Sequence, residues 1–203
     1  MSAADLKIIT FDLGNVLVKV DHLQFCRRLA DLAGISPQEV FAAVFGSDLE
    51  PSYDTGRLSS REFYEQIQAR FRVSLDFDRF VRWWTSIFAP LPEMAAVVTH
   101  LAQRYPLFLL SNTNALHFQY IQQEYPILEK FTHYVLSFAV GHRKPEPEIY
   151  QHLIEKTGAP AEQILFIDDK LPFVLAAREQ GLQAWQFTGQ DRLVQQLQEK
   201  GLW

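Results

Sequence analysis

Three aspartates follow apolar, strand-like runs in this chain of 203 residues. Asp12 comes directly after KIITF (7–11). Asp168 is the last residue of ILFID (164–168), and Asp169 follows it. Adjacent carboxylates behind a buried strand repel one another and lose solvation, a cost that a shared divalent cation relieves. Mg²⁺ takes carboxylate, water and phosphate oxygens as ligands. We therefore expect these three aspartates to meet around Mg²⁺.

Polar residues after two further apolar runs suit the binding of a phosphate group. LFLLS (107–111) ends in Ser111 and is followed by Asn112, and Lys144 lies in a loop after HYVLS (133–137). Hydroxyl, ammonium and backbone N–H groups bind phosphate oxygens, and a carboxylate can attack phosphorus as a nucleophile. Each residue alone also has an ordinary explanation as a turn, helix-cap or surface residue. Together they predict a site for phosphoryl transfer.

The elements that must position these residues are strands alternating with helical patterns. The four runs above and QAWQF (183–187) read as strands, and helical periodicity follows most of them. This alternation predicts an α/β fold, a Rossmann-like parallel sheet with helices on both faces. Ligands of such sheets bind at the carboxyl ends of the strands, where the chemically capable residues lie.

A long segment separates the first strand from the helix that leads to the second, and it predicts an inserted α-helical cap. We expect a core domain of residues 1–18 and 92–203 and a cap of residues 19–91. Ser36 and Ser59 stand where cap helices should begin. The polar, turn-rich segment 47–57 is the expected specificity loop.

Two adjacent tryptophans, Trp83 and Trp84, lie near the end of the expected cap. Neighbouring residues cannot share one face of a helix. One of the two is therefore expected to meet the core domain or the pocket.

Composition narrows the partners and the compartment. A net charge of −5 provides no broad basic field, so we expect no nucleic acid and no anionic membrane as partner. The chain shows no leader pattern and no stretch of the ~20 apolar residues that a spanning helix needs. Its single cysteine, Cys26, excludes an intramolecular disulfide. We expect a cytoplasmic monomer or weak homodimer that acts on a small phosphate ester.

The motifs FDLGNV, LLSN, RKPEP and FIDD, in this order, resemble the four motifs of the haloacid dehalogenase (HAD) superfamily. The resemblance covers essentially the whole chain, and the inserted segment resembles a C1 helical cap. It implies that Asp12 forms an aspartyl-phosphate, and that Ser111 and Lys144 orient the phosphate. It also implies a Mg²⁺ site made of Asp12, the carbonyl of Gly14, Asp169 and Asp168.

Gly14 departs from the family pattern, because most phosphatases of the superfamily have there a second aspartate that protonates the leaving alcohol. General acid–base catalysis contributes about 10²- to 10⁴-fold to a rate. An anomeric oxygen departs more readily, and DLGNV and SNTNxLH resemble bacterial alpha-D-glucose-1-phosphatases. Asp21 could stand near the leaving oxygen, or could cap the following helix. The favoured function is a Mg²⁺-dependent phosphatase for a sugar phosphate such as a hexose 1-phosphate.

Two other functions stay open at this stage. A metal-independent 2-haloacid dehalogenase also lacks the second aspartate, but Asp168 and Asp169 make physical sense chiefly around a cation. The other is a non-catalytic relative that binds a phosphometabolite or a protein. Lys170 and Phe173, which stand where relatives usually carry polar residues, keep that alternative open.

Overall fold

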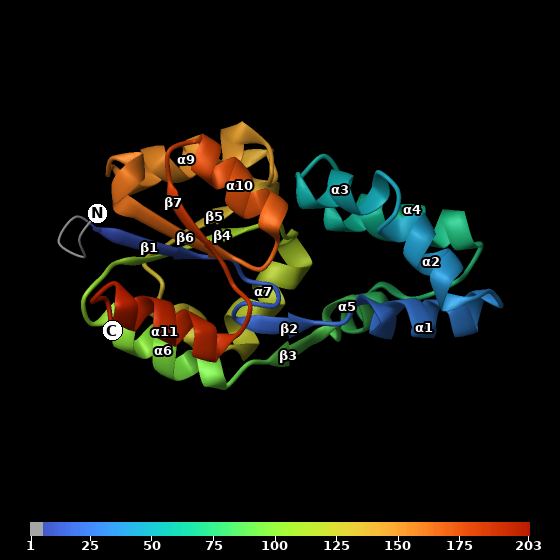
Figure 1. Cartoon of the computed structure of the whole chain (residues 1–203). Coiled ribbons are helices and arrows are strands. Elements are labelled where there is room, and N and C mark those ends of the chain that lie inside the picture. The colour runs from blue at the N-terminus through green and yellow to red at the C-terminus, as the bar shows by residue number, and fades with distance from the viewer. Residues whose placement is uncertain (1–5) are drawn as a thin grey trace.

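A five-stranded parallel sheet forms the centre of the larger domain (Figure 1). The computed structural model describes residues 6–203, so the first five residues of the expected core segment 1–18 lie outside it. The strand order is β5-β4-β1-β6-β7. The strands are β1 (Ile8–Phe11), β4 (Leu107–Ser111), β5 (His133–Leu136), β6 (Ile164–Asp168) and β7 (Gln183–Gln186). The predicted Rossmann-like α/β fold is confirmed, and the strand ends differ from the predicted ones by at most one residue.

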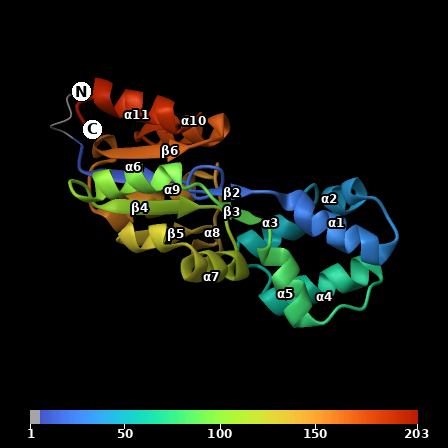
Figure 2. The same ribbon diagram turned by 90° about the horizontal axis from the view of Figure 1, so that it is seen from below.

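Helices cover both faces of this sheet (Figure 2). One face packs against α6 (Glu93–Ala102), α7 (Ala115–Glu124) and α11 (Gln190–Glu199), and the other against α9 (Pro147–Thr157) and α10 (Leu171–Glu179). Short helical turns complete the domain: α8 (Ser137–Val140), η2 (Pro126–Lys130) and η3 (Ala161–Gln163). Because β1, β4 and β6 are buried on both faces, their sequences are continuously apolar instead of alternating.

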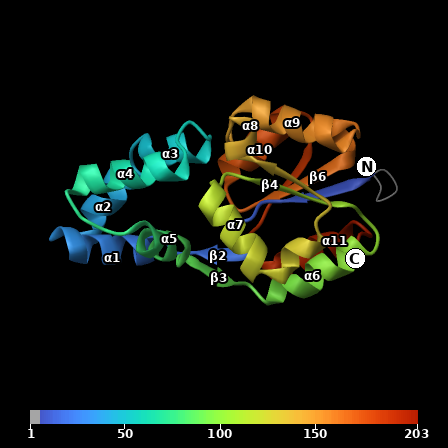
Figure 3. The ribbon, with the colours of Figure 1, turned by 180° about the vertical axis from the view of Figure 1, so that it is seen from behind.

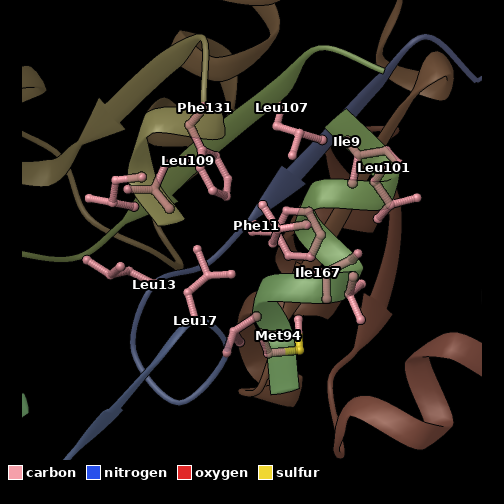
Figure 4. Packing of buried hydrophobic residues seen from close by; sticks show 14 of the residues in the cluster. Ile9, Phe11, Leu13, Leu17, Met94, Leu101, Leu107, Leu109, Phe131 and Ile167 are labelled. Carbon is pink, nitrogen blue, oxygen red and sulfur yellow. The ribbon is translucent and has the colours of Figure 1, made fainter. Parts of the chain in front are cut away.

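The side chains of each strand enter two separate cores. Phe11 belongs to the core on the α6 side, where its ring lies edge-on to Phe131 at 6.0 Å between centroids (Figure 4). Met94 of α6 and Ile167 of β6 lie in the same core. Ile8, three residues before Phe11 on β1, belongs to the opposite core, because side chains alternate between the two faces of a strand. This packing holds the carboxyl end of β1 rigidly in the middle of the sheet.

The inserted segment folds into five helices with their own apolar core (Figure 3). They are α1 (His22–Ala33), α2 (Pro37–Val44), α3 (Leu49–Asp54), α4 (Ser60–Phe71) and α5 (Phe77–Thr85). Ser36 and Ser59 begin α2 and α4 with reciprocal capping boxes, as their positions predicted. Aromatic rings dominate the core of the cap, and Cys26 is buried in it.

A two-stranded antiparallel ribbon joins the two domains. It consists of β2 (Val18–Val20) and β3 (Phe88–Pro90), and the expected boundaries at 18/19 and 91/92 fall at its core-side end. These strands are not predicted from the sequence, because strands of three residues are too short to show an alternating pattern. Within residues 6–203, no helix is both long enough and apolar enough to cross a bilayer.

Candidate active site

Lys144 joins the ends of two neighbouring strands. Its Nζ donates to Asp12 Oδ1 and to Asp168 Oδ2, each at 2.6 Å, and to the carbonyl oxygen of Leu110 at 3.1 Å. β1 and β6 are adjacent in the sheet, so Asp12 and Asp168 end up side by side. The side chain of Lys144 is only 1% exposed. A buried ammonium between two carboxylates is the centre of the site.

Burial and charge act in opposite directions on these groups. Burial alone would lower the pKa of Lys144, but the two adjacent carboxylates raise it above its ordinary value. Burial raises the pKa of Asp12 to about 6; Lys144 works against this rise, and Asp168 adds to it. Lys144 therefore stays charged, and Asp12 is ionised above about pH 6.

The residues predicted to bind metal lie close together. Asp12, Asp168 and Asp169 each offer a carboxylate oxygen, and these oxygens lie within 4.8 Å of one another. Asp12, Gly14 and Asp169 also line a cavity at these strand ends. Burial and the neighbouring Asp168 raise the pKa of Asp169, an effect that a cation would oppose. An all-oxygen donor set with excess negative charge fits Mg²⁺.

Asp168 is more constrained than Asp169. While one oxygen of Asp168 accepts from Lys144, the other accepts from the backbone N–H of Lys170 at 2.8 Å. Asp168 is fully buried, whereas Asp169 is partly exposed. Asp12 and Asp169 therefore have more oxygen atoms available to a ligand.

Ser111 and Asn112, from the motif LLSN, both line the cavity, and their side chains make different contacts. Ser111 is buried and lines the cavity, and its hydroxyl makes only a long contact of 3.4 Å to the carbonyl of Asn112. The amide of Asn112 instead holds the backbone of Lys144, with Oδ1 accepting from its N–H at 2.7 Å and Nδ2 donating to its carbonyl at 2.9 Å. The side chain of Asn112 thus positions Lys144. Asn112 also lines the cavity, and its phosphate contact stays a prediction.

Asp21 caps a helix next to the cavity. Its carboxylate caps α1 by accepting from the N–H of Leu23 at 3.0 Å, and it pairs with Arg27 at 3.7 Å. Its neighbour His22 lines the cavity, whereas Asp21 is not among the lining residues. These contacts fit the helix-cap interpretation, and a role of Asp21 near the leaving oxygen stays a prediction.

The cavity lies between the strand ends and the cap and has a volume of about 120 Å³. The cap contributes three polar side chains to its lining, those of His22, Glu50 and Asp54. The last two come from α3, so the segment 47–57 does border the site, although most of its central part is helical and not an open loop. Glu50 and Asp54 were not predicted individually as site residues, although a spacing of four residues places two side chains on one face of a helix.

Cap and core are joined through Asn114, the N-cap residue of α7. Its Nδ2 donates to Asp54 Oδ1 at 3.0 Å, and its Oδ1 accepts from Trp84 Nε1 at 3.2 Å. Trp84 also stacks on His117 of α7 at 4.5 Å between ring centroids. Trp84 is therefore the tryptophan that meets the core domain, while Trp83 is only partly buried.

Phe173 also borders the cavity. The ammonium groups of Lys144 and Lys170 each lie 5.2 Å from the centre of its ring, within range of a cation–π contact. The aromatic residue at this position thus covers the buried lysine instead of entering the apolar core.

The chain belongs to the haloacid dehalogenase-like hydrolases, because the model of that family matches residues 6–181. The resemblance seen in the four motifs is thereby confirmed. A D-ribitol-5-phosphate phosphatase of Bacteroides thetaiotaomicron is 24% identical over 188 residues, which is 89% of this chain and 91% of the relative. A sesquiterpene phosphatase of Aspergillus oryzae is 23% identical over 179 residues, 87% of each chain.

Solved structures share the whole fold, cap included. A HAD family enzyme from Bacteroides thetaiotaomicron, in complex with magnesium and inorganic phosphate, superposes with a TM-score of 0.81 at 22% identity and covers 89% of this chain and 93% of its own. A HAD-like family hydrolase from Porphyromonas gingivalis superposes with a TM-score of 0.82 at 22% identity, covering 95% and 98%.

Proposed function

We propose that this protein is a magnesium-dependent phosphatase that hydrolyses small phosphomonoesters through a phospho-Asp12 intermediate. The observation that carries the proposal is the position of Asp12 in the cavity, with one oxygen held by Lys144 and two further carboxylates beside it. Two relatives named as phosphatases and a related structure in complex with magnesium and phosphate support it.

In the proposed reaction, the free oxygen of Asp12 attacks phosphorus and the bond from phosphorus to the alcohol oxygen breaks. Water then attacks the phosphorus of phospho-Asp12, which releases inorganic phosphate and restores the carboxylate. Lys144 keeps Asp12 oriented throughout, and Ser111, which lines the cavity, binds a phosphate oxygen.

The metal would be held by Asp12, Asp169, the carbonyl of Gly14 and Asp168. When bound, Mg²⁺ neutralises the charge of the transferring phosphoryl group.

The proposed substrate is a small sugar phosphate such as a hexose 1-phosphate. A cavity of about 120 Å³ is small beside the roughly 300–1,000 Å³ of sites for drug-sized ligands, and its lining is rich in charged groups. Both features favour a compact polar substrate over a terpenyl phosphate. Gly14 offers no acid to the leaving group, which favours an anomeric oxygen. The D-ribitol-5-phosphate phosphatase also acts on a small polyhydroxy phosphate.

Release of inorganic phosphate from a panel of esters tests this function. The panel contains hexose 1-phosphate, hexose 6-phosphate, ribitol 5-phosphate and farnesyl phosphate, each with Mg²⁺ and with EDTA. We expect Mg²⁺-dependent release, fastest from the sugar phosphates. Metal-independent chloride release from 2-haloacids would instead identify a dehalogenase. Thermal stabilisation by phosphate compounds without turnover would identify a binding protein.

The expected cytoplasmic location and the monomeric or weakly dimeric state stay predictions from the sequence.

A further inference from the structure

The proposed reaction needs a proton for the departing alcohol oxygen, and this inference rests on that proposed function. Gly14, two residues after Asp12, has no side chain to supply it. Asp12 and Asp169 belong to the proposed nucleophile and metal set. The ammonium of Lys144 already donates to three oxygens. The proton source must therefore be another group that borders the cavity.

The two histidines of the cavity lining hold no such proton near neutral pH. Burial, helped by Lys170, lowers the pKa of His22 to about 4. Burial lowers the pKa of His117 to about 3. The ring nitrogens of His117 are also both engaged, one with the amide of Asn114 and the other with the carbonyl of Trp84, each at 3.0 Å. Both rings are neutral and unable to serve as strong acids.

The carboxyl groups of Glu50 and Asp54 both line the cavity. They are four residues apart on α3, so they share one helix face. Asp54 is buried, and its Oδ1 accepts from Asn114 Nδ2 at 3.0 Å. The side chain of Glu50 is 18% exposed, which makes it the member that a ligand can reach.

This pair retains a proton because little positive charge opposes its burial. Burial and the adjacent Glu50 raise the pKa of Asp54 well above its ordinary value. Burial also raises the pKa of Glu50, although Arg143 and Lys170 lower it. The guanidinium of Arg143 lies 3.9 Å from Glu50 Oε2, too far for a short charged hydrogen bond. Two neighbouring buried carboxyls cannot both ionise readily, so we infer that the pair retains one proton.

We propose that the Glu50–Asp54 pair is the catalytic acid of this site. As Asp12 attacks phosphorus, Glu50 donates the shared proton to the alcohol oxygen whose bond to phosphorus breaks, and Asp54 replenishes Glu50. In the second half, the pair accepts a proton from the water that attacks phospho-Asp12. The pair therefore ends each turnover with the proton it began with.

The cap holds this acid at a fixed position relative to the core. Asn114 binds Asp54 directly from the start of α7. Gly56, with φ of 71°, lies so close to the carbonyl of Phe138 in α8 that a side chain there would collide with it. General acid catalysis requires such placement, because proton transfer needs hydrogen-bond distance to the reacting oxygen.

Leaving-group sensitivity tests the proposal. Wild type, Glu50→Gln and Asp54→Asn are assayed with Mg²⁺ on hexose 6-phosphate, whose alkoxide needs a proton, and on p-nitrophenyl phosphate, whose phenolate leaves without one. We expect kcat/KM on the alkyl ester to fall about 10²- to 10⁴-fold in Glu50→Gln, and kcat/KM on the aryl ester to change by less than about threefold, because kcat/KM reports the steps up to release of the alcohol and not the later attack of water. The matched control is Asp48→Asn, a 79% exposed acid at the start of the same helix, which should change neither rate.

Three outcomes overturn the acid assignment. Equal losses on both esters mean that the pair positions the cap, unchanged rates mean that it is a bystander, and a raised KM at constant kcat means that it binds substrate. If wild type hydrolyses neither these two esters nor any ester of the panel above, the proposed function fails together with the inference. If wild type is active but Glu50→Gln and Asp54→Asn do not lose activity selectively on the alkyl ester, the proposed function stands and the inference fails.

A rescue variant separates a lost acid from a damaged fold. Adding Gly14→Asp to Glu50→Gln supplies a carboxyl from the core side; a Cβ at position 14 would lie 3.2 Å from Val20 Cγ2, a contact that a small side-chain shift relieves. We expect the double variant to regain at least about tenfold of the activity on the alkyl ester and none on the aryl ester. No gain in a variant of wild-type stability would contradict the proposal.

Discussion

The site brings together two acidic clusters that differ in how their charge is balanced. In the core, one buried ammonium contacts both Asp12 and Asp168 at 2.6 Å. In the cap, Glu50 and Asp54 share one face of α3, and the guanidinium of Arg143 stays 3.9 Å from Glu50. Lys144 opposes the rise in the pKa of Asp12 that burial causes, whereas burial and the adjacent Glu50 raise the pKa of Asp54 well above its ordinary value. The same side-chain chemistry thus suits attack on phosphorus in one place and protonation in the other.

The clusters also differ in how the chain builds them. The core cluster takes its members from strand ends and a loop that are distant in sequence, so that the whole sheet must form first. The cap pair comes from a single helix and depends on the core through Asn114. The position of the core cluster therefore depends on the sheet, and the position of the cap pair relative to the core depends on the contact between the two domains.

The largest effect is expected from removing the nucleophile of the core cluster. Asp12→Asn should reduce phosphate release by on the order of 10⁴-fold or more, as the loss of a nucleophile does in other hydrolases. The measurement is Mg²⁺-dependent phosphate release at saturating substrate. Asp21→Asn, which keeps a helix-capping side chain outside the cavity, is the matched control and should retain activity. Substantial turnover by Asp12→Asn would remove the phospho-aspartate from the mechanism.

Removing the shared cation should destabilise the core cluster far more than the cap. Lys144→Met leaves Asp12 and Asp168 buried without their ammonium, and breaking such a buried pair costs about 3–5 kcal/mol of unfolding free energy. Urea unfolding in the absence of Mg²⁺ measures the loss. Lys170→Met removes an exposed lysine at the rim of the same cavity and should change stability little. Similar losses in both variants would show that Lys144 is not the organising charge.

Mg²⁺ should stabilise the core cluster by binding to the folded protein. At a concentration of 100 times Kd, a ligand specific to the folded state adds about 2.7 kcal/mol, which a thermal shift detects. Asp169→Asn should abolish most of this gain. Glu146→Gln, in the more exposed group formed with His142 and Glu148, should leave it unchanged. A gain that follows Glu146 instead would move the metal away from the strand ends.

A further effect on stability concerns the link between the two clusters. Asn114→Ala leaves Asp54 and the indole N–H of Trp84 without their partner, which costs about 1–3 kcal/mol of unfolding free energy per unsatisfied group. Trp84→Phe removes the indole donor and part of a buried ring, and it should cost less than Asn114→Ala if the Asn114 network is what joins cap and core. If Trp84→Phe proved the more costly, ring packing and not the Asn114 network would join cap and core.

Much of the fold could be predicted because the sequence patterns that specify it are local. The five strands stand within one residue of apolar runs visible in the sequence, and Ser36 and Ser59 begin helices through contacts made three residues away. The ribbon of β2 and β3 was missed because a three-residue strand carries no readable period. The segment 47–57 was expected as a loop because it is polar and rich in turn residues. The helix α3 within it has only six residues, and its N-cap, Asp48, makes no capping hydrogen bond.

The sequence by itself determined the order of the four motifs, the absence of a side chain at Gly14 and the parallel sheet that brings Asp12 and Asp168 together. Only the tertiary structure decided that Asn112 holds Lys144, that Asp21 caps a helix, and that Glu50 and Asp54 border the cavity. The reason is physical. Proton affinity depends on burial and on neighbours from other segments, and neither quantity is encoded in a local pattern of residues.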